Sequence, residues 1–198
     1  LTVDNDTAIS GENVTLANAT TVAGNLTITG QNDVDLDGAV DASGNLVVTA
    51  TTIDVDATGV VVAADNDITI TGSDQALMAT VNTLQGNATI SSGNEVTIGV
   101  GNTASDIDGT LTLTSTGTDA TSDVVVSGGV TAENDVTMTA GADVIVSKLV
   151  TVSNGDISIT GTNDVTVNVG GDSRAERFLG TFDQISRLSL DIDRNYGN

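Results

Sequence analysis

The residues best suited to chemistry are aspartates in two similar segments, DVDLDG and TIDVDATG. The segments lie 19 residues apart, so a coil of about that length would stack Asp35 over Asp54 and Asp37 over Asp56. Four like charges so close together are unfavourable unless a cation lies among them. Carboxylate oxygens suit calcium, so the pattern predicts a Ca²⁺ site, the one cofactor that the sequence suggests. The alternative is that these acids are simply solvated, since the glycine-rich calcium-binding nonapeptides are absent.

Catalytic chemistry has little support among the side chains. The chain has no His and no Cys, which removes Ser-His and Cys-His nucleophiles and most zinc sites. A carboxylate pair could still hydrolyse a polysaccharide in principle. Before residue 170, however, the only cation is Lys148, and no aromatic residue is present to support a sugar ring. We therefore expect no enzyme, and a polysaccharide-acting enzyme is the third of three functions considered.

The composition describes a folded and strongly acidic chain. Its 198 residues carry 27 Asp and Glu against 5 Lys and Arg, a formal charge of −22. Such a surface repels phosphate backbones and anionic lipids, so we expect no nucleic-acid partner and no membrane insertion. No apolar run approaches the roughly 20 residues that cross a bilayer. Because Leu1 already opens a strand-like segment, LTVD, we expect the chain to be a piece or a processed product of something longer.

One short segment returns along the chain and indicates the elements that must position these residues. NLTITG is followed by NLVVTA, NDITITG, NATISSG, GTLTLTSTG, NDVTMTAG and GDISITG. Apolar and polar residues alternate within each copy, as in a strand with one buried face. The first apolar residues of the copies are spaced by 20 to 25 positions, and they are Leu26, Leu46, Ile68, Ala88, Leu111, Val136 and Ile157.

Two further apolar series interleave with this one. The second contains Val14, Val34, Ile53, a weaker match near Leu77, Val96, Val124, Val144 and Val165. The third contains Val22, Val40, Val60, Val81, Val130 and Val150. Three short strands in every 20 or so residues predict an all-β parallel β-helix, a solenoid that we expect to be right-handed. The residues before each first strand should then form a corner ladder, namely Asn25, Asn45, Asp67, Asn87, Asp135 and Asp156.

Such stacking also brings outward threonines together. They form a Thr-x-Thr column that contains Thr27, Thr29, Thr69, Thr71, Thr112, Thr114, Thr137 and Thr139, extended by Thr89, Ser91, Ser158 and Thr160. A flat array of this kind resembles the ice-binding faces of some antifreeze proteins, which implies a ligand-binding β-helix with ice or a surface glycan as its target. The alternative is structural, because threonine is a good exposed strand residue.

Degenerate turns such as GNLTITG and VDLDGAVDASGNLVVTA resemble the β-helical shafts of large bacterial surface proteins, the filamentous haemagglutinin-type adhesins and autotransporter passengers. The resemblance covers about residues 10–170. It implies secretion to the cell surface, an extended rod, and adhesive or matrix-building work. The function it favours is a non-enzymatic structural segment of an extracellular fibre, adhesin or surface layer, within a larger parent chain or by self-association.

The pattern changes after the shaft, which we place at residues 1–170. Residues 171–198 hold all four arginines and all three aromatic residues of the chain. Ser173 and Glu176 fit a capping box that opens a short helix, and RLSLDID returns to strand alternation. We expect this segment either to cap the last turn or to connect copies of the chain. The residues that would make such a connection are Arg174, Arg177, Phe178, Phe182, Arg187 and Tyr196.

Overall fold

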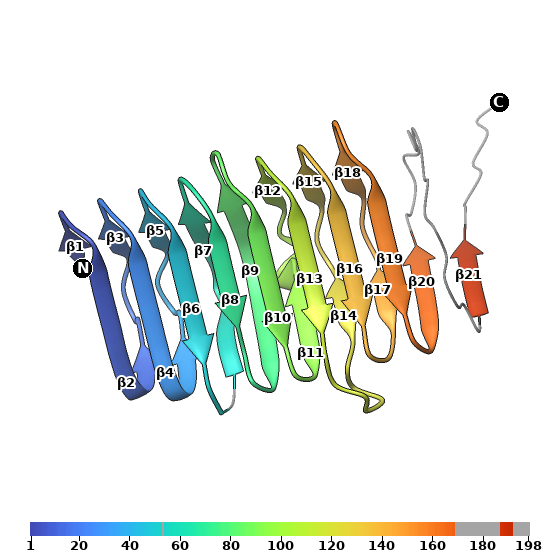
Figure 1. Cartoon of the computed structure of the whole chain (residues 1–198), viewed down its shortest axis with the longest axis horizontal. Helices are drawn as coiled ribbons and strands as arrows, with labels where there is room; N and C mark the ends of the chain where they lie inside the picture. Colours follow the sequence, from blue (N-terminus) through green and yellow to red (C-terminus); the bar gives the residue numbers. More distant parts are fainter. Residues whose placement is uncertain (53, 169–186, 192–198) are drawn as a thin grey trace.

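The alternating segments form strands that run parallel and stack as a solenoid of about eight turns (Figure 1). The structure is a computed structural model and describes residues 1–52, 54–168 and 187–191. Successive turns lie side by side along the long axis, and the N-terminus is at one end of the rod. Each turn gives one strand to each of three faces, so the predicted parallel β-solenoid is confirmed. Its handedness stays a prediction.

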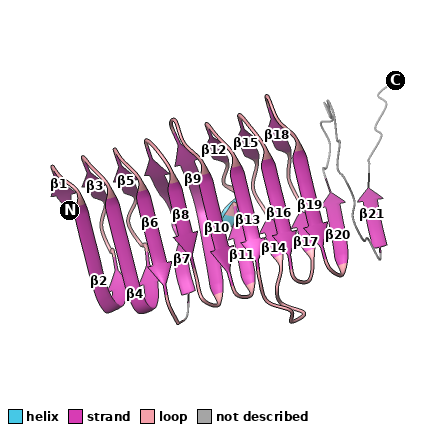
Figure 2. Ribbon diagram, in the orientation of Figure 1, coloured by secondary structure: helices cyan, strands magenta, loops and turns pink. Residues whose placement is uncertain are grey.

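The strands fill the three faces in turn (Figure 2). The first face contains Thr7–Gly11 of β2 (Thr7–Thr15), Leu26–Gly30 of β4 (Leu26–Asp35), β6 (Leu46–Ala50), β8 (Ile68–Thr71), β10 (Ala88–Ser92), β13 (Leu111–Ser115), β16 (Val136–Ala140) and β19 (Ile157–Gly161). The second contains the ends of β2 and β4, the starts of β7 (Asp54–Ala64) and β9 (Gln75–Thr83), β11 (Glu95–Ile98), β14 (Val124–Val126), β17 (Val144–Val146), β20 (Asp164–Asn168) and β21 (Arg187–Asp191). The third contains β1 (Thr2–Val3), β3 (Thr20–Val22), β5 (Val40–Ala42), the ends of β7 and β9, β12 (Ser105–Ile107), β15 (Val130–Ala132) and β18 (Val150–Val152). A single 3₁₀ turn, η1 (Val100–Asn102), joins β11 to β12 among the described residues.

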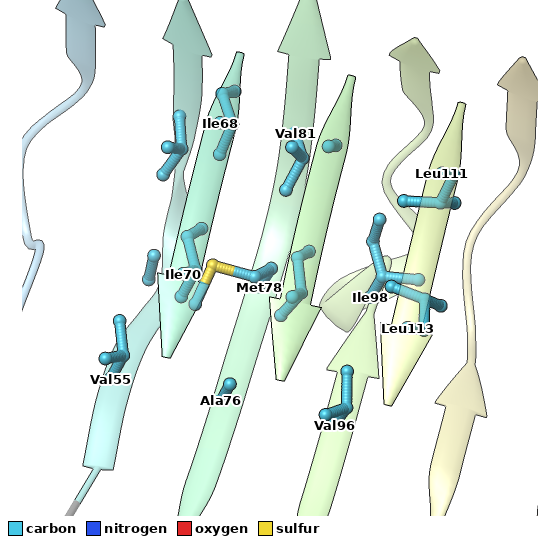
Figure 3. Close-up of a cluster of buried hydrophobic side chains, with 14 of the residues drawn as sticks. Val55, Ile68, Ile70, Ala76, Met78, Val81, Val96, Ile98, Leu111 and Leu113 are labelled. Atoms are coloured by element: carbon cyan, nitrogen blue, oxygen red, sulfur yellow. The ribbon is translucent and has the colours of Figure 1, made fainter. Parts of the chain in front are cut away.

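Aliphatic side chains fill the space between the three faces. Figure 3 shows Val55 and Ala76 from the second face lying across from Ile68, Ile70 and their neighbours of the first face, with Met78 reaching toward Ile70. All five of these residues are at most 1% exposed. Since each turn repeats the same inward positions, like side chains stack in columns along the rod. A narrow interior of this kind is filled without any aromatic residue before residue 170.

The predicted corner ladder is present and begins one turn earlier than expected, at Asp6. In each case a side-chain Oδ1 accepts a hydrogen bond from the backbone N–H at the same position one turn later. The donors and distances are Asn25 to Asp6 2.8 Å, Asn45 to Asn25 2.8 Å, Asp67 to Asn45 3.1 Å, Asn87 to Asp67 2.8 Å, Thr110 to Asn87 2.9 Å and Asp156 to Asp135 2.9 Å. The ladder pairs backbone donors at a corner, where the strand ladder leaves them without a strand partner.

Part of the predicted alignment on the second face is wrong. Val34 pairs with Val55, and Ala76 pairs with Val55 in the next turn, so these residues replace Ile53 and Leu77 in the column. Ile53 lies outside the described residues. The corner between β6 and β7 is one residue longer than the corresponding corner inside β4, which shifts the pairing. The slip from Ile53 to Val55 is two residues, which keeps the sequence pattern intact because side chains alternate with period two. Leu77 differs, since it lies one residue from Ala76 and occupies the outward position between the buried Ala76 and Met78.

The same two-residue slip occurs on the third face. Val40 pairs with Thr20 and with Val62, and Val60 and Val22 therefore leave the column that the sequence series gave them. Val22 is still fully buried, because it pairs with Ala42 and occupies the neighbouring inward column. The period of the fold was thus predicted correctly, while the register of two corners was not.

The alternation predicts that inward and outward positions differ sharply in tolerance. Ile70→Asp would put a carboxylate among aliphatic side chains, where Ile70 is 0% exposed, and should cost about 3 kcal/mol or more. Thr69→Asp, on the exposed side of the same strand, should change stability by less than about 0.5 kcal/mol. Thermal unfolding followed by circular dichroism measures both. Equal tolerance at the two positions would show that the inside and outside are assigned wrongly.

Two consecutive residues test the corner ladder. Asp67 accepts hydrogen bonds from Asn87, whereas the exposed Asn66 precedes it in the same turn. Asp67→Ala should lower the free energy of unfolding by about 1 kcal/mol, because a backbone N–H loses its acceptor. Asp67→Asn keeps the oxygen and should lose much less, and Asn66→Ala is the matched control. A urea titration in which both alanine variants behave alike would rule out this role for the ladder.

Candidate functional site

The outward threonines of the first face lie in register over the whole stack. They form two parallel columns, which we together call the hydroxyl face. One column contains Ala8, Thr27, Val47, Thr69, Thr89, Thr112, Thr137 and Ser158. The other contains Ser10, Thr29, Thr49, Thr71, Ser91, Thr114, Thr139 and Thr160. All ten threonines and both serines named from the sequence are thus brought together, and Thr49 joins them.

The hydroxyl face is regular because backbone pairing sets its spacing. Like positions in successive turns lie about 4.8 Å apart, and positions two residues apart along a strand lie roughly 6.8 Å apart. The second column carries a hydroxyl in all eight turns, whereas Ala8 and Val47 interrupt the first. The Thr71 and Ser91 hydroxyls are 3.4 Å apart, a weak contact within that column. The face can therefore present a repeating grid of hydroxyl and methyl groups.

The four aspartates of the predicted calcium site do not stack as expected. Asp35 pairs with Asp56, and Asp54 pairs with Gln75, so the expected Asp35–Asp54 and Asp37–Asp56 stacks are wrong. The reason is the register of β7, where Val55 rather than Ile53 continues the column of Val34. Within the described residues, no group of three or more acidic side chains lies close enough to share a metal ion. Calcium binding by these residues stays a prediction.

The same register creates an acidic column that the sequence analysis missed. It occupies the outward position just before the inward residues of the second face, and its acidic members are Asp33, Asp54, Glu95, Asp123, Asp143 and Asp164. Asn13 and Gln75 hold the same position in their turns. The signal was available in the sequence, because each member directly precedes a valine or alanine of the second face. It could be found only after Val55 and Ala76 had been placed in that face.

Several members of the acidic column have a structural partner. The Oδ1 of Asp54 accepts from the Gln75 N–H at 3.0 Å, and Asp123 and Asp143 accept in the same way from the next turn at 3.0 Å. The column therefore repeats at a second corner what the corner ladder does at the first. This interaction explains why acidic side chains line up there although Lys148 is the only cation before residue 170.

Burial and neighbouring carboxylates raise the pKa of three aspartates on this face, Asp35, Asp54 and Asp123. Burial first, and then Asp33, Asp56 and Asp37, raise the pKa of Asp35. Burial also raises the pKa of Asp54, with a further contribution from Asp74, while the hydrogen bond from Gln75 acts in the opposite direction.

Asp123 and Asp6 show the two opposite directions. Burial, reinforced by Asp143 and Glu95, raises the pKa of Asp123. The fully exposed Asp6 differs, because hydrogen bonds from Asn25 lower its pKa. Within the acidic column, the charged forms of Asp54 and Asp123 are thus disfavoured at neutral pH, whereas the charged form of Asp6 in the corner ladder is favoured.

The residues predicted to connect copies fall mostly outside the described part of the chain. Arg174, Arg177, Phe178, Phe182 and Tyr196 lie there, as does the expected short helix. The expected strand is confirmed over β21, which pairs in parallel with β20. In that pairing Arg187 is in register with Asp164, so its backbone position continues the acidic column.

Comparison with family models, with curated proteins and with solved structures gives no match to this chain. The fold therefore stands as a parallel β-solenoid, and the resemblance to adhesin shafts remains an expectation drawn from the sequence. Among the described residues, no helix has the length and apolar character needed to span a membrane.

The raised pKa values predict how stability depends on pH. A carboxyl whose folded pKa exceeds its unfolded value destabilises the fold above the folded pKa, and the loss is recovered as the pH falls through it. Asp54→Asn keeps the oxygen that accepts from Gln75 and removes the charge. It should stabilise the protein at pH 7 by up to about 1 kcal/mol after solvent screening, or roughly 2–4 °C in Tm. Near pH 3, where the wild-type carboxyl is protonated, the gain should vanish.

The exposed Asp108 provides the matched control for this measurement. Asp108→Asn should give a smaller change at pH 7 than Asp54→Asn. Melting curves at both pH values and low ionic strength decide the point. A gain for Asp54→Asn that is equally large near pH 3 would contradict an electrostatic origin.

Calcium binding is tested on the corrected pair. If Asp35 and Asp56 hold the ion, millimolar calcium raises the Tm of the wild type but not that of Asp35→Asn/Asp56→Asn, because only carboxylates supply the needed charge. Magnesium at equal ionic strength controls for screening. An identical response of wild type and double variant would end the calcium hypothesis.

Proposed function

We propose that the chain is a non-enzymatic structural segment of an extracellular fibre, adhesin or surface layer, acting as a stiff rod. The observation that carries this proposal is the continuous backbone pairing of the stack. Backbone pairing links every turn to the next, from β1 to β20, on at least two faces. Such a stack holds its ends apart without needing any recognition site along its length.

The interior and exterior of the rod support the same role. Aliphatic columns give each turn the same buried face, so length can be added without a new core. The outer surface is acidic, with a shaft of 22 acids and one Lys in residues 1–170, a net charge of −21. Like-charged rods repel one another laterally, which favours solubility and limits aggregation between sheet edges.

Asp41 and Asp106 are too far apart to hydrolyse a polysaccharide together. A shallow surface hollow on the third face is lined by both of them and by Asp65. Asp41 and Asp106 lie three turns apart, with Ala63 and Asn82 between them in the column. At about 4.8 Å per turn their separation is roughly 14 Å, which exceeds the roughly 5–9.5 Å between the two carboxyls of glycosidases.

Electron microscopy and localisation together test the structural role. Negative-stain images of the parent assembly, with immunogold labelling of cells that make it, should reveal labelled rods or filaments at the cell surface. Discrete globules, or labelling confined to the cell interior, would contradict the proposal. Release of reducing ends from a panel of polysaccharides by the purified chain would contradict its non-enzymatic part.

The hydroxyl face supports a second candidate, the binding of ice or of a surface glycan. Its second column offers a hydroxyl at a constant spacing in eight successive turns, a repeat that an ordered array of hydroxyls or waters could match. A structural explanation remains sufficient, since threonine suits any exposed strand. The binding role is therefore the runner-up.

Thermal hysteresis at micromolar protein tests the ice target, and retention on insoluble glycans tests the other. Thr71→Tyr places a bulky ring in the middle of the hydroxyl face and should abolish either activity. Thr131→Tyr, at an exposed position of the third face, is the matched control and should leave it unchanged. Absence of ice shaping and glycan retention in the wild type would remove this candidate.

A further inference from the structure

One corner of the solenoid contains a side chain and a backbone nitrogen that can react with each other. Asn154 is directly followed by Gly155, and this is the only Asn-Gly pair in the chain. Both residues lie between β18 and β19, outside any strand, and both are exposed (Figure 1). Asn134, one turn earlier at the same corner, is also exposed but is followed by Asp135. A glycine at the next position leaves an asparagine amide most open to attack by the backbone, because it has no side chain.

The length of this corner explains why the glycine is there. The corner between the third and first faces has four residues at 84–87 and at 153–156, and three in the other turns that the structure describes. In both longer corners the third residue is glycine, Gly86 and Gly155. A Cβ on Gly155 would lie 2.6 Å from the backbone nitrogen of Asp135 in the turn before, and Gly86 meets the same kind of obstacle. Packing between turns therefore requires glycine at this position.

The residue before the glycine distinguishes the two longer corners. It is Gln85 in one and Asn154 in the other. The backbone positions match, since the Gln85 N–H donates to Asp65 O at 2.8 Å and the Asn154 N–H donates to Glu133 O at 2.7 Å. The glutamine side chain is one methylene longer, so attack by the next backbone nitrogen would close a larger ring, which forms more slowly. Only the asparagine corner therefore combines the required glycine with a side chain of reactive length.

The Asn154 side chain is also less constrained than other asparagines of the corner ladder. Its Nδ2 donates to Glu133 Oε1 at 3.4 Å, which is long for a hydrogen bond. Three other asparagines of this corner accept a backbone N–H of the next turn through Oδ1 at 2.8 to 3.1 Å, and they are Asn25, Asn45 and Asn87. The weak contact of Asn154 leaves its amide able to rotate toward the backbone nitrogen that follows.

We propose that Asn154 is a site of spontaneous deamidation. The backbone nitrogen of Gly155 loses its proton and bonds to Cγ of Asn154, and the Cγ–Nδ2 bond breaks so that Nδ2 leaves as ammonia with that proton. Water then opens the cyclic imide at one of its two carbonyl carbons. Opening at Cγ gives aspartate. Opening at the main-chain carbonyl gives isoaspartate, in which the backbone runs through the former side chain and is one methylene longer. Water is the only reagent.

Both products change the corner that contains them. A carboxylate replaces the amide that donates to Glu133, so a hydrogen bond becomes a contact between like charges. Isoaspartate also lengthens the segment that brings the Asn154 N–H to Glu133 O and the Asp156 N–H to Asp135 Oδ1. Modification should therefore loosen the corner between β18 and β19. This inference does not depend on the proposed structural function, because the chemistry needs only the folded chain and water.

The test is to incubate the folded, full-length wild type at mildly alkaline pH below its melting temperature and to digest samples over time. Mass spectrometry should show a growing fraction of the Asn154 peptide with –OH in place of –NH₂, separable by chromatography into aspartate and isoaspartate forms. Peptides with Gln85 or Asn134 from the same samples should stay unmodified. An unmodified Asn154 peptide overturns the proposal, whether or not a urea-unfolded reference converts. Equal conversion of Asn134 also overturns it, because the following glycine would then not be the cause.

Two variants connect the modification to the corner. Asn154→Gln keeps an amide near Glu133, should melt within about 2 °C of the wild type, and should lose the mass change and the isoaspartate signal. Asn134→Gln is the matched control and should leave both unchanged. Hydrogen exchange of the Asn154 and Asp156 N–H groups should be faster in aged than in fresh wild type, with no such difference in Asn154→Gln. Equal exchange in fresh and aged, modified wild type would overturn the loosening of the corner.

Discussion

Backbone pairing between successive turns is the interaction on which the rest of this structure depends. Alternate residues of a strand point their N–H and C=O groups to the turn before and to the turn after, so each interior strand donates and accepts on both sides. Residues at the same position in successive turns therefore form a column. Inward side chains of similar character therefore recur in successive turns, because each occupies the same environment. An inward residue such as Leu46 lies between Leu26 and Ile68, and all three are buried by the same surroundings. A polar residue at that level would be surrounded by aliphatic groups both above and below.

The outer surface is governed by a weaker version of the same constraint. Columns also form outside, and in an acidic chain they bring like charges to a spacing of about 4.8 Å. The structure reduces the cost by using acids as hydrogen-bond acceptors, as when Asp143 accepts from the Asp164 N–H. An Asn can take the same place, as Asn25 and Asn45 do in the corner ladder. The acidic side chains of this protein therefore also supply hydrogen-bond acceptors for backbone N–H groups at the corners.

The first turn of the solenoid shows how much burial the interior turns gain from their neighbours. Inside the rod, each edge is paired and each apolar face is covered by a neighbour of the same kind. The first turn lacks such a neighbour among the described residues, and Ile9 is consequently less buried than Ile28.

The sequence by itself determined the class of fold, the three strands per turn, the corner ladder and the hydroxyl face. Each of these follows from local alternation and a repeated spacing, which are visible without knowing any contact. The tertiary structure alone decided which residues share a column at irregular corners. Val55, rather than Ile53, pairs with Val34. This register separates the aspartates that were expected to stack and forms the acidic column. A two-residue shift of register leaves a period-two alternation unchanged. Only the packing and pairing of complete turns therefore distinguish the two registers.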